Sequence, residues 1–268
     1  MEVRVINVKI PRKHKRLHLE PLGDLHIGSP AFDRQKFLER VKAIARDPDR
    51  YTIIMGDIID NVRPYRRGVV DKRFTYHGVD RSVMTPTEQI RLFHDYVNPI
   101  KHKILGVLWG NHEFTTMEYD EFRETVCRLP DGTVLPFLGS MCFLRLVVSN
   151  GAMTRSWNVW ACHGSYGGMK RGGAINRLED LSLQYDADVY LHAHTHLKEF
   201  SVASAWTITP DGELDEWRRI YVLTGTFMRK HVVGFDSYSE KRPSLLQSRV
   251  GTITVVFDLE TGKTHAIE

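Results

Sequence analysis

The sequence has few cysteines, no long apolar run and no marked excess of one charge. Its three cysteines, Cys127, Cys142 and Cys162, are odd in number and far apart, so they form neither a disulfide framework nor a zinc-finger pattern. No segment approaches the roughly 20 consecutive apolar residues that span a bilayer, and the first residues lack the apolar run of a signal peptide. These absences predict a soluble, cytoplasmic protein with reduced thiols and no membrane partner.

Neither charge sign dominates the chain. Lys and Arg number 37 and Asp and Glu 33, which leaves a formal net charge of +4. This mild excess suits an anionic substrate, whereas nucleic-acid-binding proteins are often more basic. The 268 residues show no linker, low-complexity segment or solenoid repeat, and they suffice for one large core. We therefore expect residues 1–268 to form a single domain.

Strand and helix patterns alternate over most of the chain. Asp33 and the box Thr85-Pro86-Thr87-Glu88 predict two helix starts, because their side chains can cap backbone N–H groups. Further helices are expected near 118–128 and 174–185. The expected strands cover residues 2–8, 17–22, 51–55, 104–109, 141–149, 156–162, 189–192, 199–208, 218–225, 250–257 and 263–267.

Five of the predicted strands end in side chains that bind metals. The side chains are Asp24 and His26, then Asp57, Asn111, His163, and finally His194 with His196. In open α/β sheets, functional groups gather beyond the carboxyl ends of the strands. We therefore expect these seven side chains to converge, although they come from distant parts of the sequence.

The spacing and chemistry of this set favour a pair of ions. Asp24 and His26 are two positions apart, as are His194 and His196, and such pairs project to the same side of an extended segment. Carboxylate, amide and imidazole donors without thiolate favour Mn²⁺, iron or Zn²⁺. Seven donors exceed the needs of one ion, so a shared carboxylate holding two ions ~3.5–4 Å apart is expected.

The order of five motifs resembles that of the calcineurin-like metallophosphoesterases. They are Gly23-Asp24-Leu25-His26, Gly56-Asp57-Ile58-Ile59-Asp60, Gly110-Asn111-His112-Glu113, His163-Gly164 and His194-Thr195-His196. One motif alone would be weak, but all five occur in order over roughly residues 20–200. The resemblance implies an α/β fold, a four-layer α/β/β/α sandwich of two mixed sheets, with two divalent metal ions at one rim. Manganese is the first choice, and iron or zinc are the alternatives.

The resemblance also assigns roles to individual residues, with Asp57 bridging the two ions. Asp24, His26 and His196 would complete the site of one ion, and Asn111, His163 and His194 that of the other. His112 would face the substrate phosphate and either protonate the leaving oxygen or stabilise phosphoryl charge. Asp60 would orient His112 and set its tautomer. Glu113 is most simply a helix-start carboxylate or one that supports the neighbouring ligands.

One departure from the family pattern bears on the substrate. Phosphoprotein phosphatases of this superfamily carry Arg-Gly after the residue equivalent to Asp60, and the Arg grips the phosphate. This chain has Asn61-Val62 instead. The difference favours the phosphodiesterase branch over a protein phosphatase.

These features predict a hydrolase that cleaves a phosphate ester with a hydroxide bridging two metal ions. A phosphodiester, as in a nucleotide or nucleic acid, is the preferred substrate. A phosphomonoesterase, or an enzyme of relaxed action on mono-, di- and triesters, is the alternative. From other classes, a non-catalytic nucleic-acid-binding module and an esterase for carbon esters remain open, although the intact ligand set argues against the binding module.

Each of these residues also has a structural alternative. A strand-end Asp or Asn often caps a turn or helix, and His163 or Asp60 can be ordinary polar residues. The basic loop over residues 63–73 either lines a substrate path or is a solvated charged face. The glycine-rich segment 164–173 is either a gating loop or a plain connection.

Overall fold

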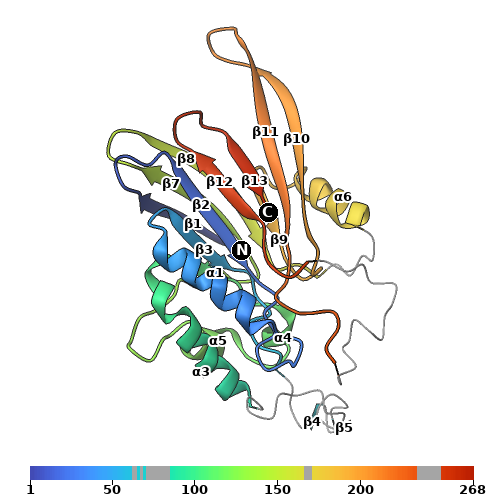
Figure 1. Ribbon diagram of the computed structural model, residues 1–268. Coiled ribbons are helices and arrows are strands. Elements are labelled where there is room, and N and C mark those ends of the chain that lie inside the picture. The colour runs from blue at the N-terminus through green and yellow to red at the C-terminus, as the bar shows by residue number, and fades with distance from the viewer. Residues whose placement is uncertain (62–64, 67–68, 71–84, 166–170, 234–248) are drawn as a thin grey trace.

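The computed structural model describes residues 1–61, 65–66, 69–70, 85–165, 171–233 and 249–268. Two β-sheets stack face to face, and helices cover their outer faces (Figure 1). The short strands β4 (Tyr65–Arg66) and β5 (Val69–Val70) pair separately. Most of the basic loop 63–73 and half of the glycine-rich segment 164–173 lie outside the described residues.

The larger sheet has six strands in the order β1-β7-β8-β9-β11-β10. They are β1 (Glu2–Lys9), β7 (Met141–Ser149), β8 (Thr154–Cys162), β9 (Val189–His192), β11 (Leu214–Thr224) and β10 (Lys198–Ile208). The pairs β1–β7, β8–β9 and β9–β11 are parallel, and the pairs β7–β8 and β11–β10 are antiparallel. The sheet is therefore mixed, as predicted.

The smaller sheet has five strands in the order β13-β12-β2-β3-β6. They are β13 (Thr264–Ile267), β12 (Thr254–Asp258), β2 (Arg16–Leu22), β3 (Arg50–Ile54) and β6 (Ile104–Val107). Strands β2, β3 and β6 run parallel, whereas β12 is antiparallel to both neighbours. Three consecutive parallel strands bring three carboxyl ends to one edge of this sheet.

Alternating apolar residues hold the two sheets together. In β7, Leu144, Leu146 and Val148 are buried and alternate with more exposed residues, which is the pattern of a strand with one face on the core. They pack in one cluster with Leu19 of β2 and Val255 of β12. The main hydrophobic core thus lies between the sheets.

Two helices begin at their predicted caps, whereas the helix expected near 174–185 covers residues 171–181. Helix α1 (Arg34–Arg46) starts at Asp33, whose carboxylate accepts the Lys36 N–H at 3.1 Å. Helix α3 (Pro86–Val97) starts at the capping box of Thr85 and Glu88. The 3₁₀ helix η2 (Asn98–Lys103), α4 (Asn111–Phe114), α5 (Tyr119–Thr125) and α6 (Arg171–Leu181) follow.

The helices form the two outer layers of the sandwich. Phe37 of α1 and Phe93 of α3 join a second core cluster with Ile54 at the end of β3, so these helices cover the five-stranded sheet. Leu178 of α6 packs with Trp160 of the six-stranded sheet. The arrangement confirms the predicted four-layer α/β/β/α fold. None of the described helices is long and apolar enough to cross a membrane.

Two strands begin four residues away from their predicted starts, and the other strand boundaries differ by two residues at most. Strand β11 begins at Leu214 rather than at 218, because Ile208 and Leu214 still pair across the turn. Strand β12 begins at Thr254 rather than at 250. Gly251, with φ of +133°, instead makes an isolated bridge with Thr226, and this backbone conformation ends the regular ladder.

Candidate metal centre

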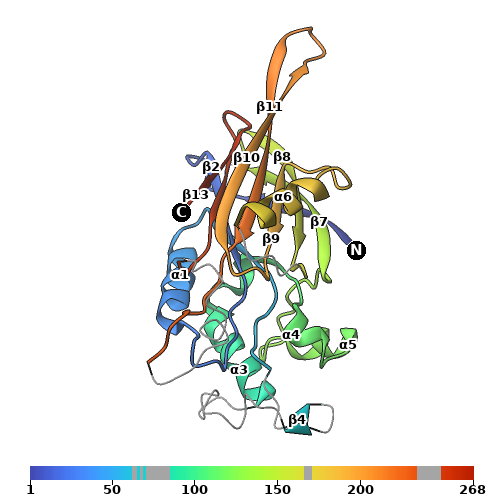
Figure 2. The ribbon, with the colours of Figure 1, turned by 90° about the vertical axis from the view of Figure 1, so that its right-hand side faces the viewer.

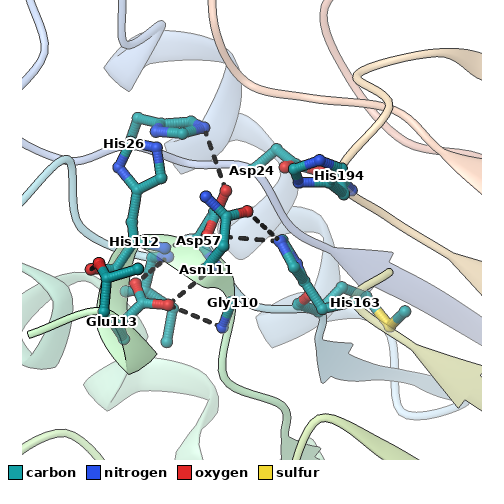
Figure 3. Close-up of polar contacts among 12 residues, drawn as sticks. Asp24, His26, Asp57, Gly110, Asn111, His112, Glu113, His163 and His194 are labelled. Carbon is teal, nitrogen blue, oxygen red and sulfur yellow. Dashed lines mark hydrogen bonds and ion pairs between the residues drawn. The ribbon is translucent and has the colours of Figure 1, made fainter. Parts of the chain in front are cut away.

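All seven predicted ligands come together at the rim where parallel strands of both sheets end (Figure 3). The five-stranded sheet supplies the residues that follow β2, β3 and β6, and the six-stranded sheet those that follow β8 and β9. Because the parallel strands of each sheet share a direction, their carboxyl ends meet at this rim. Only the stacking of the two sheets brings the two halves of the site together.

The first group of donors consists of Asp24, His26 and His196, whose ligand atoms lie within 4.8 Å of one another. The His196 Nε2 atom is 3.3 Å from Asp24 Oδ1 and 3.3 Å from His26 Nε2. Asp24 and His26 are buried, whereas His196 is partly exposed. Asp24 and His26 therefore form the buried side of the group, and His196 lies on the side that is open to solvent.

The second group consists of Asp57, His163 and His194, again with ligand atoms within 4.8 Å. Its His163 Nε2 atom lies 3.4 Å from Asp57 Oδ1 and 3.2 Å from the Asn111 side-chain oxygen. Asn111 is thus the fourth donor of this group. Asp57 and His163 are almost fully buried, at 1% and 2% exposure.

Asp57 lies between the two groups. Its Oδ1 atom faces His163 at 3.4 Å, and its Oδ2 atom lies 3.8 Å from His26 Nε2. Each carboxylate oxygen therefore points toward a different group, which is the geometry that a bridging carboxylate needs.

Backbone carbonyls orient two of the imidazoles. His163 Nδ1 is 2.8 Å from the Met55 carbonyl and His112 Nδ1 is 2.9 Å from the Asp60 carbonyl. A carbonyl only accepts, so each Nδ1 carries the proton and Nε2 is left as the lone-pair donor of the neutral ring. Such outer contacts are typical of histidines that hold metals.

The donors present fit divalent cations. Among the described residues, the buried His194 Nδ1 atom has no hydrogen-bond partner, and a buried polar atom without a partner is costly. The set consists of oxygen and imidazole nitrogen atoms with no sulfur, which suits Mn²⁺, iron or Zn²⁺. A cation at the second group would give the His194 imidazole the partner it lacks.

The charges of the site are strongly coupled. Burial would raise the pKa of Asp57, but the adjacent His163 holds it well below its usual range. Burial would likewise lower the pKa of His163, but Asp57 raises it to about 9. Asp24 and His196 form a similar pair. Burial opposes both shifts, but the charge of His196 lowers the pKa of Asp24, and the charge of Asp24 raises the pKa of His196. Both carboxylates are therefore anions that attract positive charge.

Two histidines of the site are held neutral instead. Burial is the main cause of the lowered pKa of both His26 and His194. Neutral imidazole is the form that binds metal, because a protonated nitrogen has no lone pair to donate. The site thus combines ionised carboxylates with two neutral imidazoles, those of His26 and His194.

The backbone at the site adopts an unusual conformation. Five of the seven predicted ligands have a positive φ, namely Asp24 (49°), His26 (49°), Asp57 (47°), His194 (63°) and His196 (57°). This left-handed region costs a residue with a side chain roughly 1–2 kcal/mol. Strain of this kind persists where surrounding contacts hold it, and it gathers at functional sites. Hydrogen bonds from the Leu25 and His26 N–H groups to the Asp57 carbonyl are among those contacts.

Glu113 holds the loop that carries Asp57. Its buried carboxylate accepts the N–H groups of Asp57 (3.1 Å), Ile58 (2.7 Å), Ile59 (3.0 Å) and Gly110 (2.8 Å). A Cβ at Gly110 would overlap the Asp57 carboxylate. The sequence predicts a helix-start carboxylate here, and Glu113 does stand in the first turn of α4. Its contacts with the Asp57 loop depend on tertiary structure.

The contact between Asp60 and His112 takes a form that the sequence did not predict. The Asp60 carbonyl, not its carboxylate, lies at 2.9 Å from His112 Nδ1. The carboxylate is 3.9 Å from that atom and 3.5 Å from His26 Nδ1. The backbone of Asp60 thus orients His112, and its side chain lies closer to the first donor group.

Asn61 is a residue of the site region whose role sequence reasoning missed. Its side-chain amide donates to the His112 carbonyl and to the Thr116 hydroxyl, and its own N–H donates to Gln89 at 3.0 Å. With φ of 52° it also has left-handed backbone. Asn61 therefore ties the segment after β3 to the start of α4. The only sequence signal for this role is that Asn61 stands where protein phosphatases of the superfamily carry Arg.

Comparisons with known proteins agree with the motifs. A family model described as calcineurin-like phosphoesterase matches residues 22–198, a range that contains all seven predicted ligands and 177 of the 268 residues. The DNA polymerase II small subunit of Thermoplasma acidophilum is 27% identical over 107 residues, which cover 38% of this chain and 20% of that relative. The chain thus matches about a fifth of that protein's length.

Two solved structures align with most of the chain at low identity. Vps29 from Cryptosporidium parvum has 17% identity and a TM-score of 0.38, with 95% of this chain and 97% of that chain covered. A metallophosphoesterase from Sphaerobacter thermophilus has 13% identity and a TM-score of 0.35, with 94% and 89% covered.

The contacts of Glu113 predict that Glu113→Gln destabilises the protein. Gln retains one acceptor oxygen but turns an NH₂ group toward two of the four N–H groups, so those two lose their partner. We expect a loss of about 2–4 kcal/mol in the free energy of unfolding, measured by urea denaturation. The exposed Glu39→Gln on α1 is the matched control and should change stability by less than about 0.5 kcal/mol. Equal stability of the two variants would contradict the role given to Glu113.

Proposed function

Because the chain belongs to the calcineurin-like phosphoesterase family, we propose that it is a phosphoesterase with two divalent metal ions that prefers phosphodiesters. The observation that carries this proposal is the position of Asp57 between two groups of donors. Two adjacent groups sharing one carboxylate suit the paired ions of an in-line displacement at phosphorus.

In this proposal, each donor group holds one ion. Asp24, His26, Asp57 and His196 hold the first, and Asp57, Asn111, His163 and His194 hold the second. Mn²⁺ is the preferred ion, with iron or Zn²⁺ as alternatives, because the donors are oxygen and imidazole nitrogen. Bound there, the ions would polarise the phosphoryl oxygens and lower the pKa of water toward neutrality.

His112 is proposed to act on the leaving group. Its side chain is 22% exposed, and its ring lies edge-on to His26 with centroids 4.4 Å apart. The Asp60 carbonyl fixes Nδ1, which leaves Nε2 for the substrate. Protonated at Nε2, His112 would donate a proton to the departing oxygen and stabilise charge on the phosphoryl group.

Two observations support a phosphodiester over a phosphomonoester. Asn61 stands where protein phosphatases of the superfamily carry the Arg that grips phosphate, and its amide is engaged with His112 and Thr116. A diester carries one negative charge fewer than a monoester dianion, so it depends less on that cation. The relative named as a DNA polymerase II small subunit favours a nucleotide or nucleic acid as the context.

Replacing the bridging carboxylate tests the metal centre. Asp57→Asn keeps the shape of the side chain and removes the charge that both donor groups share, so metal content should fall by at least one equivalent. Turnover should fall by more than the roughly 10- to 100-fold typical of outer partners of metal ligands. Metal analysis of the purified protein is the direct measurement, with exposed Asp180→Asn on α6 as control. Normal metal content in Asp57→Asn would overturn the assignment.

The role of His112 predicts a different phenotype. His112→Ala should retain both metals and lose about 10²–10⁴-fold in kcat, most with esters of poorly leaving alcohols, which need the proton. A series of aryl esters of rising leaving-group pKa measures this dependence. The exposed His102→Ala is the control. An equal loss on every ester would argue against proton donation.

A panel of model esters tests the preferred substrate. With Mn²⁺, kcat/KM should be higher for bis(p-nitrophenyl) phosphate than for p-nitrophenyl phosphate, and a chelator should abolish both activities. p-Nitrophenyl acetate tests the alternative of a carbon-ester esterase. Faster hydrolysis of the monoester than of the diester would contradict the preference for phosphodiesters but not the assignment of the metal centre.

A further inference from the structure

The hairpin formed by β10 and β11 projects beyond the rest of the six-stranded sheet. Its two strands pair continuously from Lys198 and Thr224 to Ile208 and Leu214, whereas β9 pairs with β11 only over residues 220–223. Both views show the hairpin extending past the neighbouring strands (Figures 1 and 2). The outer half of this hairpin therefore has no neighbouring strand on either side among the described residues.

Strand β10 is also the edge of its sheet, with no described strand on its outer side. Residues 200–208 read Phe-Ser-Val-Ala-Ser-Ala-Trp-Thr-Ile, without a charge, a proline or a glycine. Natural edge strands are usually protected by lysine, proline, a bulge or short length. Strand β10 has its only charges, Lys198 and Glu199, at its first two positions. Residues 200–208 have none of these protective features, so their outward N–H and C=O groups can pair with another strand.

One face of the hairpin is apolar and exposed. Phe200, Val202, Trp206 and Ile208 alternate along β10 and so share a face, with exposed fractions of 40%, 46%, 70% and 72%. Leu214, 67% exposed, lies opposite Ile208 on the same face. Between Phe200 and Ile208 on this face only Ser204 is polar, and an apolar stripe of this kind marks an interaction surface more often than scattered apolar residues do.

The sequence of this edge is chemically symmetric about Ser204. Residues equidistant from it are alike: Phe200 and Ile208 are large and apolar, Ser201 and Thr207 carry hydroxyls, and Val202 and Trp206 are again large and apolar. If two such strands run antiparallel with Ser204 opposite Ser204, each residue meets one of its own kind. Self-complementarity of this sort is what an interface with twofold symmetry requires.

We propose that β10 pairs antiparallel with β10 of a second copy of this chain, with the twofold axis at Ser204. The two six-stranded sheets then form one continuous sheet, and the two apolar stripes lie side by side on one face. Phe200 would stand across from Ile208 of the partner subunit, and Val202 across from Trp206 of the partner subunit. Such cross-strand apolar pairs, together with the ladder of backbone hydrogen bonds, would stabilise the dimer.

The charges near this stripe are compatible with pairing. Glu216 and Arg218 lie opposite Trp206 and Ser204 in the ladder, and they pair with each other at 2.7 Å. They therefore bring no uncompensated charge to the twofold axis. The candidate metal centre lies at the Lys198 end of β10, because His194 and His196 directly precede this strand. Pairing centred on Ser204 therefore takes place away from it.

The dimer is tested by sedimentation velocity of the full chain, from about 1 to 100 µM. The wild-type chain should sediment as a dimer in a concentration-dependent equilibrium. Ser204→Lys and Ser204→Glu each place like charges directly opposite one another across the axis, so each should weaken the dimer at least about tenfold. An equimolar mixture of the two variants places opposite charges there and should restore dimerisation.

Asp211→Asn in the hairpin turn is the matched control for Ser204→Lys, because it raises the net charge by the same amount outside the paired segment. Circular dichroism and thermal unfolding show whether each variant is folded. A wild-type chain that stays monomeric, including one that binds an unrelated protein through this edge, would overturn the proposal. So would a dimer that tolerates both Ser204 substitutions, or a mixture of the variants that stays monomeric.

Discussion

The arrangement of the donor side chains at the rim depends on the buried carboxylate of Asp57. It follows β3, the middle one of the three parallel strands β2, β3 and β6. It has one oxygen toward His163 and the other toward His26, and it accepts the His112 N–H at 2.9 Å. An anion in so buried a place is stable only with charged or hydrogen-bonding partners. The neighbouring histidines provide them here, and in the proposed function two cations do so.

A second buried carboxylate, that of Glu113, holds the loop that carries Asp57. Glu113 accepts four backbone N–H groups, and these hydrogen bonds oppose the rise in its pKa that burial causes. The N–H groups have no strand partner because the chain leaves the sheet there, so Glu113 satisfies donors that would otherwise be buried and unpaired. This arrangement lets the strained φ of Asp57 persist, since the contacts on both sides fix the backbone.

The fold separates a rigid site from an exposed edge. At one end of the strands, backbone carbonyls orient His163 and His112, and Glu113 of the short helix α4 holds the loop that carries Asp57. At the other end, the β10–β11 hairpin leaves the sheet with an uncharged edge and an apolar stripe. The site can therefore be organised within one chain, whereas the hairpin is proposed to be completed by a second copy.

The sequence alone determined which residues carry chemistry and where the main elements begin. A strand that ends at Asp24 or Asp57, and the caps at Asp33 and Thr85, are local patterns whose meaning depends on neighbours in the sequence. The ordered motifs also predicted the sandwich fold.

The tertiary structure alone decided how Asp60 contacts His112, which segments Glu113 and Asn61 hold, and which donor side chains are open to solvent. Those contacts join segments some 50 residues apart, such as Asn61 and His112, or come from different sheets, such as Met55 and His163. Sequence periodicity carries no information about such distances, because they depend on how the two sheets stack.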